Sequence, residues 1–187
     1  MFEEHPFLKL VKEGKIEFTK EGKIIGFREY AILIPVRVIN RLYLILKEKL
    51  PGEFREILKK LGKFQIRQAL SRYIKTLGWS SIEKQKFLEF GFTFLTSSLG
   101  LGNFTVHFKG KKFFITTSKT PFAEEFVLEY GKQEEPIDYY LCGMWEEVFT
   151  IFTGKPMVCE EVKCYAKGDD CCEFVVRPKE EIEKENK

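Results

Sequence analysis

The chain has 187 residues, of which 44% are hydrophobic, 15% aromatic and 32% charged. This length fits one folded domain or at most two small ones, and the 19 Phe exclude intrinsic disorder, because so apolar a chain can bury enough surface to offset its backbone entropy. The net charge of +3 conceals an asymmetry: residues 1–120 hold 23 Lys or Arg against 11 acids, whereas residues 121–187 hold 8 against 17.

The location of the protein is predicted from what the sequence lacks. The longest apolar run, Tyr30 to Pro35, is far shorter than the roughly 20 residues of a bilayer-spanning helix. The first residues are acidic where a secretory signal is basic and then apolar. We therefore expect a cytoplasmic protein without a membrane span, and its abundance of Lys and Glu over amides is typical of thermophile proteins.

The hydrophobic periodicity predicts strands and helices in alternating groups. In chain order we expect a hairpin (15–18 and 23–27), a buried strand (29–34), helices (36–50, 53–61 and 64–77), a helix ending near residue 98 after a capping box at Ser80, a hairpin (105–109 and 113–117), a helix (136–153) and two strands (157–166 and 172–176). Gly62 is expected to end the second of these helices. This order predicts an α+β fold, an antiparallel β-meander packed with several helices. We expect a single domain over 1–178, with the hairpin 15–27 preceding a core over 28–177, and a charged tail over 179–187.

The cysteines are the most informative feature of the sequence. Four of the five lie between residues 159 and 172, and in a cytoplasmic protein such clustering indicates metal binding or reactivity more than disulfides. A hairpin centred on Gly168 places Cys164 opposite Cys172, at a separation that two thiolates can bridge to one Zn²⁺. Glu161 reaches the same ion only if its strand kinks, because unbroken alternation places residues 161 and 164 on opposite faces.

A fourth ligand has several candidates. Cys142, on the preceding predicted helix, can complete the site if that helix packs over the hairpin. Asp138 lies one turn earlier on the same helical side, and Cys159 shares the face of Glu161. The alternative is that these thiols only pack in the core, as buried Cys often does.

Several motifs in this region resemble the 4-vinyl reductase domain family. They are Gly143, Gly154, Glu161-Val-Lys-Cys164, Ala166-Lys-Gly168-Asp169 and Cys172-Glu-Phe174-Val-Val, with Thr120-Pro-Phe-Ala-Glu124 and Ile34-Pro35-Val36 upstream. The resemblance implies a ligand-binding α+β domain like those of nitric-oxide signalling and Golgi transport, similar to the sensor domains of phenol-responsive activators and to vesicle-transport complex subunits. It also implies a homodimer and a structural zinc.

In the aromatic sensors of this family the zinc is held by a helix Cys, a Glu and two further Cys. The last three correspond to Glu161, Cys164 and Cys172, while the family spacing places the helix Cys at Asp138. Either Asp138 supplies an oxygen or Cys142 substitutes for the missing thiol. We favour Cys142, because thiolate is the softer zinc donor.

The predicted function is that of a sensor or carrier domain for a small hydrophobic molecule, with a structural zinc. Abundant aromatic side chains on the helices can line an apolar pocket, although for each of them a role in the core is the simpler interpretation. The candidate pocket residues are Phe87, Phe90, Phe94, Trp145 and Phe149.

Two other functions remain open. The basic half, with Arg67, Arg72 and Lys75 on one predicted helix, can bind nucleic acid, but the acidic C-terminal third would repel phosphate and makes this less favoured. A zinc-dependent enzyme requires an open coordination position. The sequence shows no dinucleotide fingerprint and no catalytic constellation, so we do not expect an enzyme despite the family's name.

Overall fold

The computed structural model describes residues 4–76 and 86–185, and the capping box predicted at Ser80 lies outside them. The helices are α1 (Pro6–Lys12), α2 (Val36–Lys49), α3 (Phe54–Thr76), the π-helix η2 (Phe87–Gly91), α5 (Phe92–Ser98), α6 (Pro121–Tyr130), α7 (Tyr139–Thr153), the 3₁₀ turn η3 (Tyr165–Lys167) and α8 (Lys179–Glu185). The strands are β1 (Ile16–Phe18), β2 (Ile24–Gly26), β3 (Glu29–Ala31), β4 (Thr105–Lys109), β5 (Lys112–Thr117), β6 (Met157–Lys163) and β7 (Cys172–Pro178). The predicted α+β class is confirmed.

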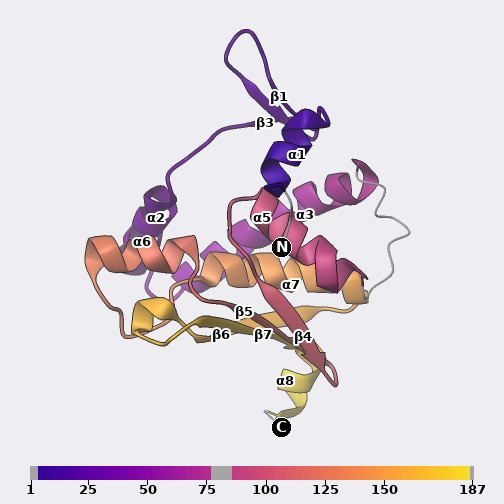
Figure 1. Ribbon diagram of the computed structural model, residues 1–187. Helices are drawn as coiled ribbons and strands as arrows, with labels where there is room; N and C mark the ends of the chain where they lie inside the picture. Colours follow the sequence, from indigo (N-terminus) through magenta and orange to yellow (C-terminus); the bar gives the residue numbers. More distant parts are fainter. Residues whose placement is uncertain (1–3, 77–85, 186–187) are drawn as a thin grey trace.

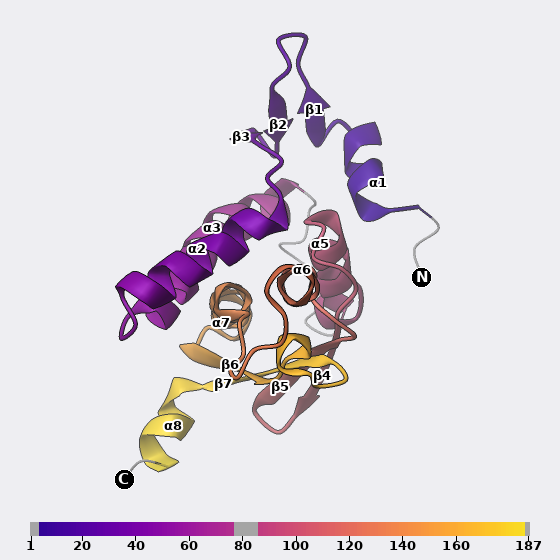
Figure 2. The same ribbon diagram turned by 90° about the vertical axis from the view of Figure 1, so that its left-hand side faces the viewer.

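The strands form two antiparallel sheets at a distance from each other (Figure 1). The small sheet β1-β2-β3 is a meander near the N-terminus, and the larger sheet has the order β4-β5-β7-β6. The second order is not a meander, because β7 inserts between β5 and β6. Figure 2 shows the small sheet at one end of the molecule and α8 at the other.

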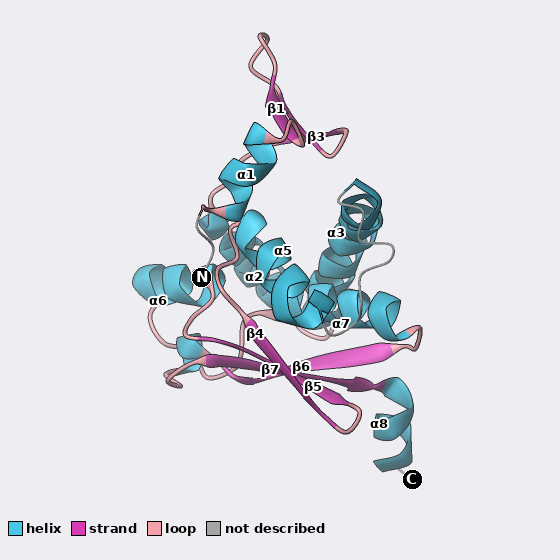
Figure 3. Ribbon diagram, turned by 45° about the vertical axis from the view of Figure 1, so that its right-hand side comes forward, coloured by secondary structure: helices cyan, strands magenta, loops and turns pink. Residues whose placement is uncertain are grey.

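The core lies between α7 and the larger sheet (Figure 3). Strand β7 alternates regularly between buried and half-buried residues, and its buried positions include Cys172, Phe174 and Val176. Trp145 and Phe149 of α7 are fully buried, and Trp145 contacts Phe174 across the interface. The predicted helix begins at Tyr139 rather than at residue 136, and ends at Gly154 in the left-handed conformation.

Helix α3 crosses α7 at very short range, which corrects the prediction that Gly62 ends a helix. A Cβ at Gly62 would lie 2.0 Å from the carbonyl oxygen of Tyr140, and one at Gly143 would lie 2.0 Å from that of Lys59. Glycine is therefore required at both positions by close backbone approach. Helix α3 runs unbroken from Phe54 to Thr76, because the contact with α7 outweighs the weak helix propensity of glycine.

Two further elements differ from the prediction. The segment 29–34, expected as a buried strand, forms only the short strand β3, and all of its residues are exposed. Helix α6 was not predicted. It begins at Thr120, whose hydroxyl accepts a hydrogen bond from the Ala123 N–H at 2.9 Å, with Pro121 in the first turn.

Candidate metal centre

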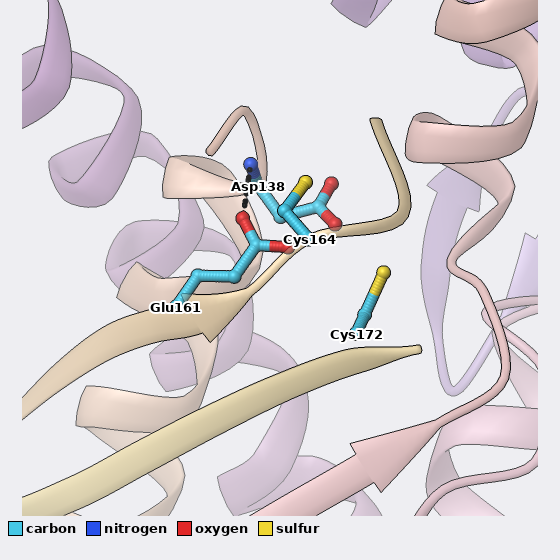
Figure 4. Close-up of side chains that lie close together, drawn as sticks. All are labelled: Asp138, Glu161, Cys164 and Cys172. Atoms are coloured by element: carbon cyan, nitrogen blue, oxygen red, sulfur yellow. Dashed lines mark hydrogen bonds between the residues drawn. The ribbon is translucent and has the colours of Figure 1, made fainter. Parts of the chain in front are cut away.

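The hairpin of β6 and β7 contains the irregularity that the sequence analysis required. Glu161 pairs with Phe174 and Lys163 pairs with Glu173, so Val162 is an extra residue in β6. This β-bulge shifts the alternation by one residue. Glu161 and Cys164 consequently point into the same space, as Figure 4 shows.

Four side chains meet beyond the bulge. One ligand atom from each of Asp138, Glu161, Cys164 and Cys172 lies within 4.8 Å of all the others (Figure 4). They come from the start of α7, from β6, from the residue that follows β6 and from the first residue of β7. This is the only such group of three or more His, Cys, Asp or Glu among residues 4–76 and 86–185.

Hydrogen bonds hold the carboxyl groups and the connecting turn in place. The Thr120 hydroxyl donates to Asp138 Oδ2 at 2.7 Å, and the Asp138 N–H donates to Glu161 Oε2 at 3.0 Å. In the turn after β6, the Cys164 N–H donates to Asp169 Oδ2 at 2.8 Å. Each carboxyl group is therefore positioned by a neighbour from another part of the chain, and the turn is held by its own residues.

The site is anionic and has an unmet need for positive charge. Asp138 Oδ1 and Glu161 Oε1 are both buried without a hydrogen-bond partner among the described residues. Burial and the nearby Cys172 raise the pKa of Asp138 to about 7, and burial together with Asp138 raises the pKa of Glu161 to about 11. No Lys or Arg within the described part of the chain forms an ion pair with either carboxyl group.

The two thiols of the group divide one proton between them. The hydrogen bond from Cys164 lowers the pKa of Cys172 to about 6, with help from the Tyr165 N–H, which donates to Cys172 Sγ at 3.4 Å. The same interaction and burial raise the pKa of Cys164 well above its ordinary value. Two sulfurs and two buried carboxylate oxygens with unmet valence form a donor set that fits Zn²⁺.

Cys142 and Cys159 lie outside this group, which corrects the preference for Cys142 over Asp138. Both are buried, and the thiol of Cys142 interacts with that of Cys159. Asp138 is the residue before α7, with φ −84° and ψ 37°. Because this backbone is not helical, its side chain leaves the helical side on which Cys142 lies.

The predicted pocket residues are distributed through the core. Phe87, Trp145 and Phe149 are buried and pack against other rings, such as that of Phe92 with Trp145 at 5.0 Å between centroids. Phe94 is half-buried, and the side chain of Phe90 lies outside the described part of the structure. None of the four described residues lines the groove that the structure contains.

That groove has a volume of about 840 Å³ and lies between the small sheet and helices α2, α3 and α7. Its floor includes Ile39, Ala69, Leu101 and Met144, and its rim includes the exposed segment that follows β3. The sequence analysis noted this segment as the longest apolar run but interpreted it as a buried strand. The missed signal was its short distance from Pro35, which leaves little room for strand pairing.

The comparisons with known proteins identify the family to which the C-terminal part is related. Residues 120–178 match the family model of the vinyl-4-reductase domain, and these residues include all four members of the candidate site. The predicted resemblance to the 4-vinyl reductase family is thereby confirmed. An uncharacterized protein of Methanocaldococcus jannaschii is 25% identical over 182 residues, which cover 91% of this chain and 90% of that protein.

Three solved structures share the fold. The phenol-responsive sensory domain of the transcription activator PoxR, with phenol, has a TM-score of 0.75 at 19% identity, covering 92% of this chain and 88% of that one. Subunit 3 of the trafficking protein particle complex from Naegleria fowleri, covalently bound to palmitic acid, has a TM-score of 0.53 at 18% identity, covering 77% of this chain and 95% of that one. A vinyl-4-reductase family protein from Methanocaldococcus jannaschii has a TM-score of 0.52 at 18% identity, covering 95% and 97%.

These likenesses establish the fold. No helix among the described residues is both long and apolar enough to cross a bilayer.

Proposed function

We propose that this protein is a binding domain for a small hydrophobic molecule, with a sensor or carrier role, and that a structural zinc ion fastens its C-terminal hairpin to α7. The observation that carries the ligand-binding part is the apolar groove of about 840 Å³, which falls within the range of small-molecule sites. The fold likeness to a phenol-bound sensory domain and to a palmitate-bound subunit supports it.

The ligand is expected to lie on the floor of the groove. Met144 is buried and Ile39 and Ala69 are half-buried there, while the polar side chains of Gln65 and Gln68 stand at the edge. Such a lining favours an apolar body with at most a few polar atoms.

Calorimetric titration with phenol and with palmitic acid tests this site. We expect at least one probe to bind, and Ala69→Phe, which fills the floor of the groove, to weaken binding at least about tenfold. Leu128→Ala is the matched control, because Leu128 is exposed on α6 and does not line the groove. Absence of binding at millimolar concentrations, or equal binding by Ala69→Phe, would refute the proposal.

For zinc, the residues that would hold the ion are Asp138, Glu161, Cys164 and Cys172. The bound ion would neutralise two carboxylates that have no cationic partner within the described part of the chain and would cross-link three of its segments. With four side-chain ligands no position remains for a substrate or an activated water, so the proposed role is structural.

Metal analysis of protein purified without added zinc tests this part separately. We expect close to one equivalent, and its loss in Cys164→Ser and in Cys172→Ser. Cys171→Ser is the control, since Cys171 neighbours Cys172 but is outside the group. Less than about 0.2 equivalents in the parent protein would contradict the proposal.

The fourth ligand is decided by two further variants in the same measurement. Asp138→Asn removes the carboxylate that the geometry brings to the site, and we expect it to lower the zinc affinity. Cys142→Ser is expected to retain zinc. The reverse result would restore Cys142 as the ligand.

A further inference from the structure

A strongly exposed apolar surface lies beside the groove. We call residues 30–34, which connect β3 to α2, the strap. Its large side chains are exposed by 75% at Tyr30, 80% at Ile32, 80% at Leu33 and 50% at Ile34, and Phe64 of α3 is exposed by 69%. All five also line the rim of the groove, so they form one continuous surface.

The area of this surface is that of a protein interface. At roughly 200 Å² for a fully exposed large side chain, the five residues expose on the order of 700 Å² of mostly apolar surface. A monomeric protein rarely leaves so large an apolar patch in water. Each partner of a standard stable interface contributes roughly 800 Å².

The backbone next to the strap is also incompletely paired. Strand β3 is at the edge of its sheet and, in the described part of the chain, pairs only with β2. An exposed edge strand with apolar neighbours is a site for association with another chain unless something covers it.

We propose that a second copy of this chain covers this surface. In a twofold arrangement the strap of each copy packs over the open side of the other copy's groove, so that the same patch meets itself. The chain supplies both the protruding strap and the concave groove, which makes the surface complementary to itself. This inference depends neither on the ligand nor on the zinc ion.

The charges around the patch distinguish this partner from an anionic one. Neither residues 30–47 nor residues 57–76 contain an acid, and Arg37, Arg41 and Lys60 are exposed there. Two copies bring like charges together, so added salt should strengthen the dimer by screening them. A flat anionic surface would pair with the same cations, would be released by salt, and would leave the groove open to water.

The test is the mass of the complete protein in solution, measured by light scattering and sedimentation at about 50 µM in low and high salt. We expect twice the chain mass of 22.0 kDa, with at least as much dimer at high salt. Leu33→Asp and, independently, Phe64→Ser should shift the dimer dissociation constant at least about 100-fold. Both side chains are exposed, so these variants should fold, as circular dichroism would confirm.

Leu128→Asp is the control, because Leu128 is 77% exposed on α6 and lies outside the groove; it should leave the dimer intact. A monomeric parent protein at 50 µM would overturn the proposal. So would a dimer that both patch variants preserve, since it would form through another surface. Salt-sensitive binding to vesicles containing anionic lipid, abolished by Leu33→Asp in a monomeric parent, would assign the patch to a membrane instead.

Discussion

Two pairs of acidic residues have buried carboxyl groups at different places along α7, and the protein neutralises them in different ways. Glu146 and Glu147 lie in the middle of α7, and α3 provides cations for both: Lys59 Nζ is 2.8 Å from Glu146 Oε1, and Arg67 Nε is 2.7 Å from Glu147 Oε1. Asp138, at the start of α7, and Glu161 have no such partners among the residues that the structure describes.

The difference shows where the chain is complete by itself and where it requires a cation from outside. Along the contact with α3, each acid faces a basic side chain, and the Cys159 N–H also donates to Glu146 Oε1 at 3.0 Å. At the start of α7, the neighbours of Asp138 and Glu161 are two thiols and each other. Because a buried unpaired carboxylate is costly, the second pair must either hold protons or bind a metal ion.

Removal of the metal should have the largest effect. With zinc bound we expect the protein to lose about 5 kcal/mol or more of unfolding free energy on treatment with a chelator, because the ion connects α7 to both strands of the hairpin. Thermal unfolding with and without chelator measures this. Cys171→Ser should respond as the parent does, and Cys172→Ser should show no further loss. An unchanged melting temperature in a zinc-loaded protein would contradict the structural role.

Removal of a buried cation should rank second. Lys59→Met leaves Glu146 with the half-exposed Lys63 as its remaining cation in the described part of α3, and we expect a loss of about 3 kcal/mol in urea unfolding. The double variant Lys59→Met, Glu146→Gln should recover part of this loss, since the uncompensated charge is gone. A loss below about 1 kcal/mol would show that the pair is not important for stability.

The pH dependence of the metal-free protein should be a smaller effect. The folded pKa values of Asp138 (about 7) and Glu161 (about 11) are raised above their unfolded values near 4. Their contribution to stability is therefore fully present below pH 4 and decreases as the pH rises. Between pH 4 and pH 6, before Cys172 ionises, we expect a decrease of roughly 2 kcal/mol.

The variant Asp138→Asn, Glu161→Gln is the reference for this measurement, since subtracting its profile removes the contributions of other acids. The zinc-loaded protein should show the opposite slope, because the ligands must lose their protons to bind. A metal-free protein that becomes more stable from pH 4 to pH 6 relative to the variant would contradict the raised pKa values.

The smallest effect is expected at an exposed ion pair. Arg67 contacts Glu147 through two nitrogens, at 2.7 and 3.1 Å, but its side chain is 65% exposed. Water and salt screen such a pair, so Arg67→Ala should cost roughly 0.5–1 kcal/mol in urea unfolding. A loss as large as that of Lys59→Met would mean that exposure does not decide the strength of these pairs.

Local patterns predicted much of the fold and three members of the site. The spacing of apolar residues and turn glycines predicts the two hairpins and α7, because these elements depend on contacts between near neighbours. The need for a kink before Cys164 also followed from strand alternation, and the bulge at Val162 is its structural counterpart. Whether zinc occupies the site remains a proposal.

The errors share a different cause, which is contact between distant segments. Gly62 ends no helix because it is the point where α3 meets α7. Asp138 replaced Cys142 in the group because α7 begins one residue after it, so that its side chain follows the non-helical backbone. Helix α6 depends on Thr120, whose hydroxyl serves both the cap of that helix and Asp138.

The sequence by itself therefore determined the α+β class, the cysteine hairpin and the concentration of acids and thiols in the last third of the chain. Only the tertiary structure decided which acids receive a cation from α3, which fourth residue joins the thiols, and that the apolar strap lies on the surface. Periodicity describes which residues share a face of one element. It does not describe which other element covers that face, and the free energy of a buried charge depends on that covering neighbour.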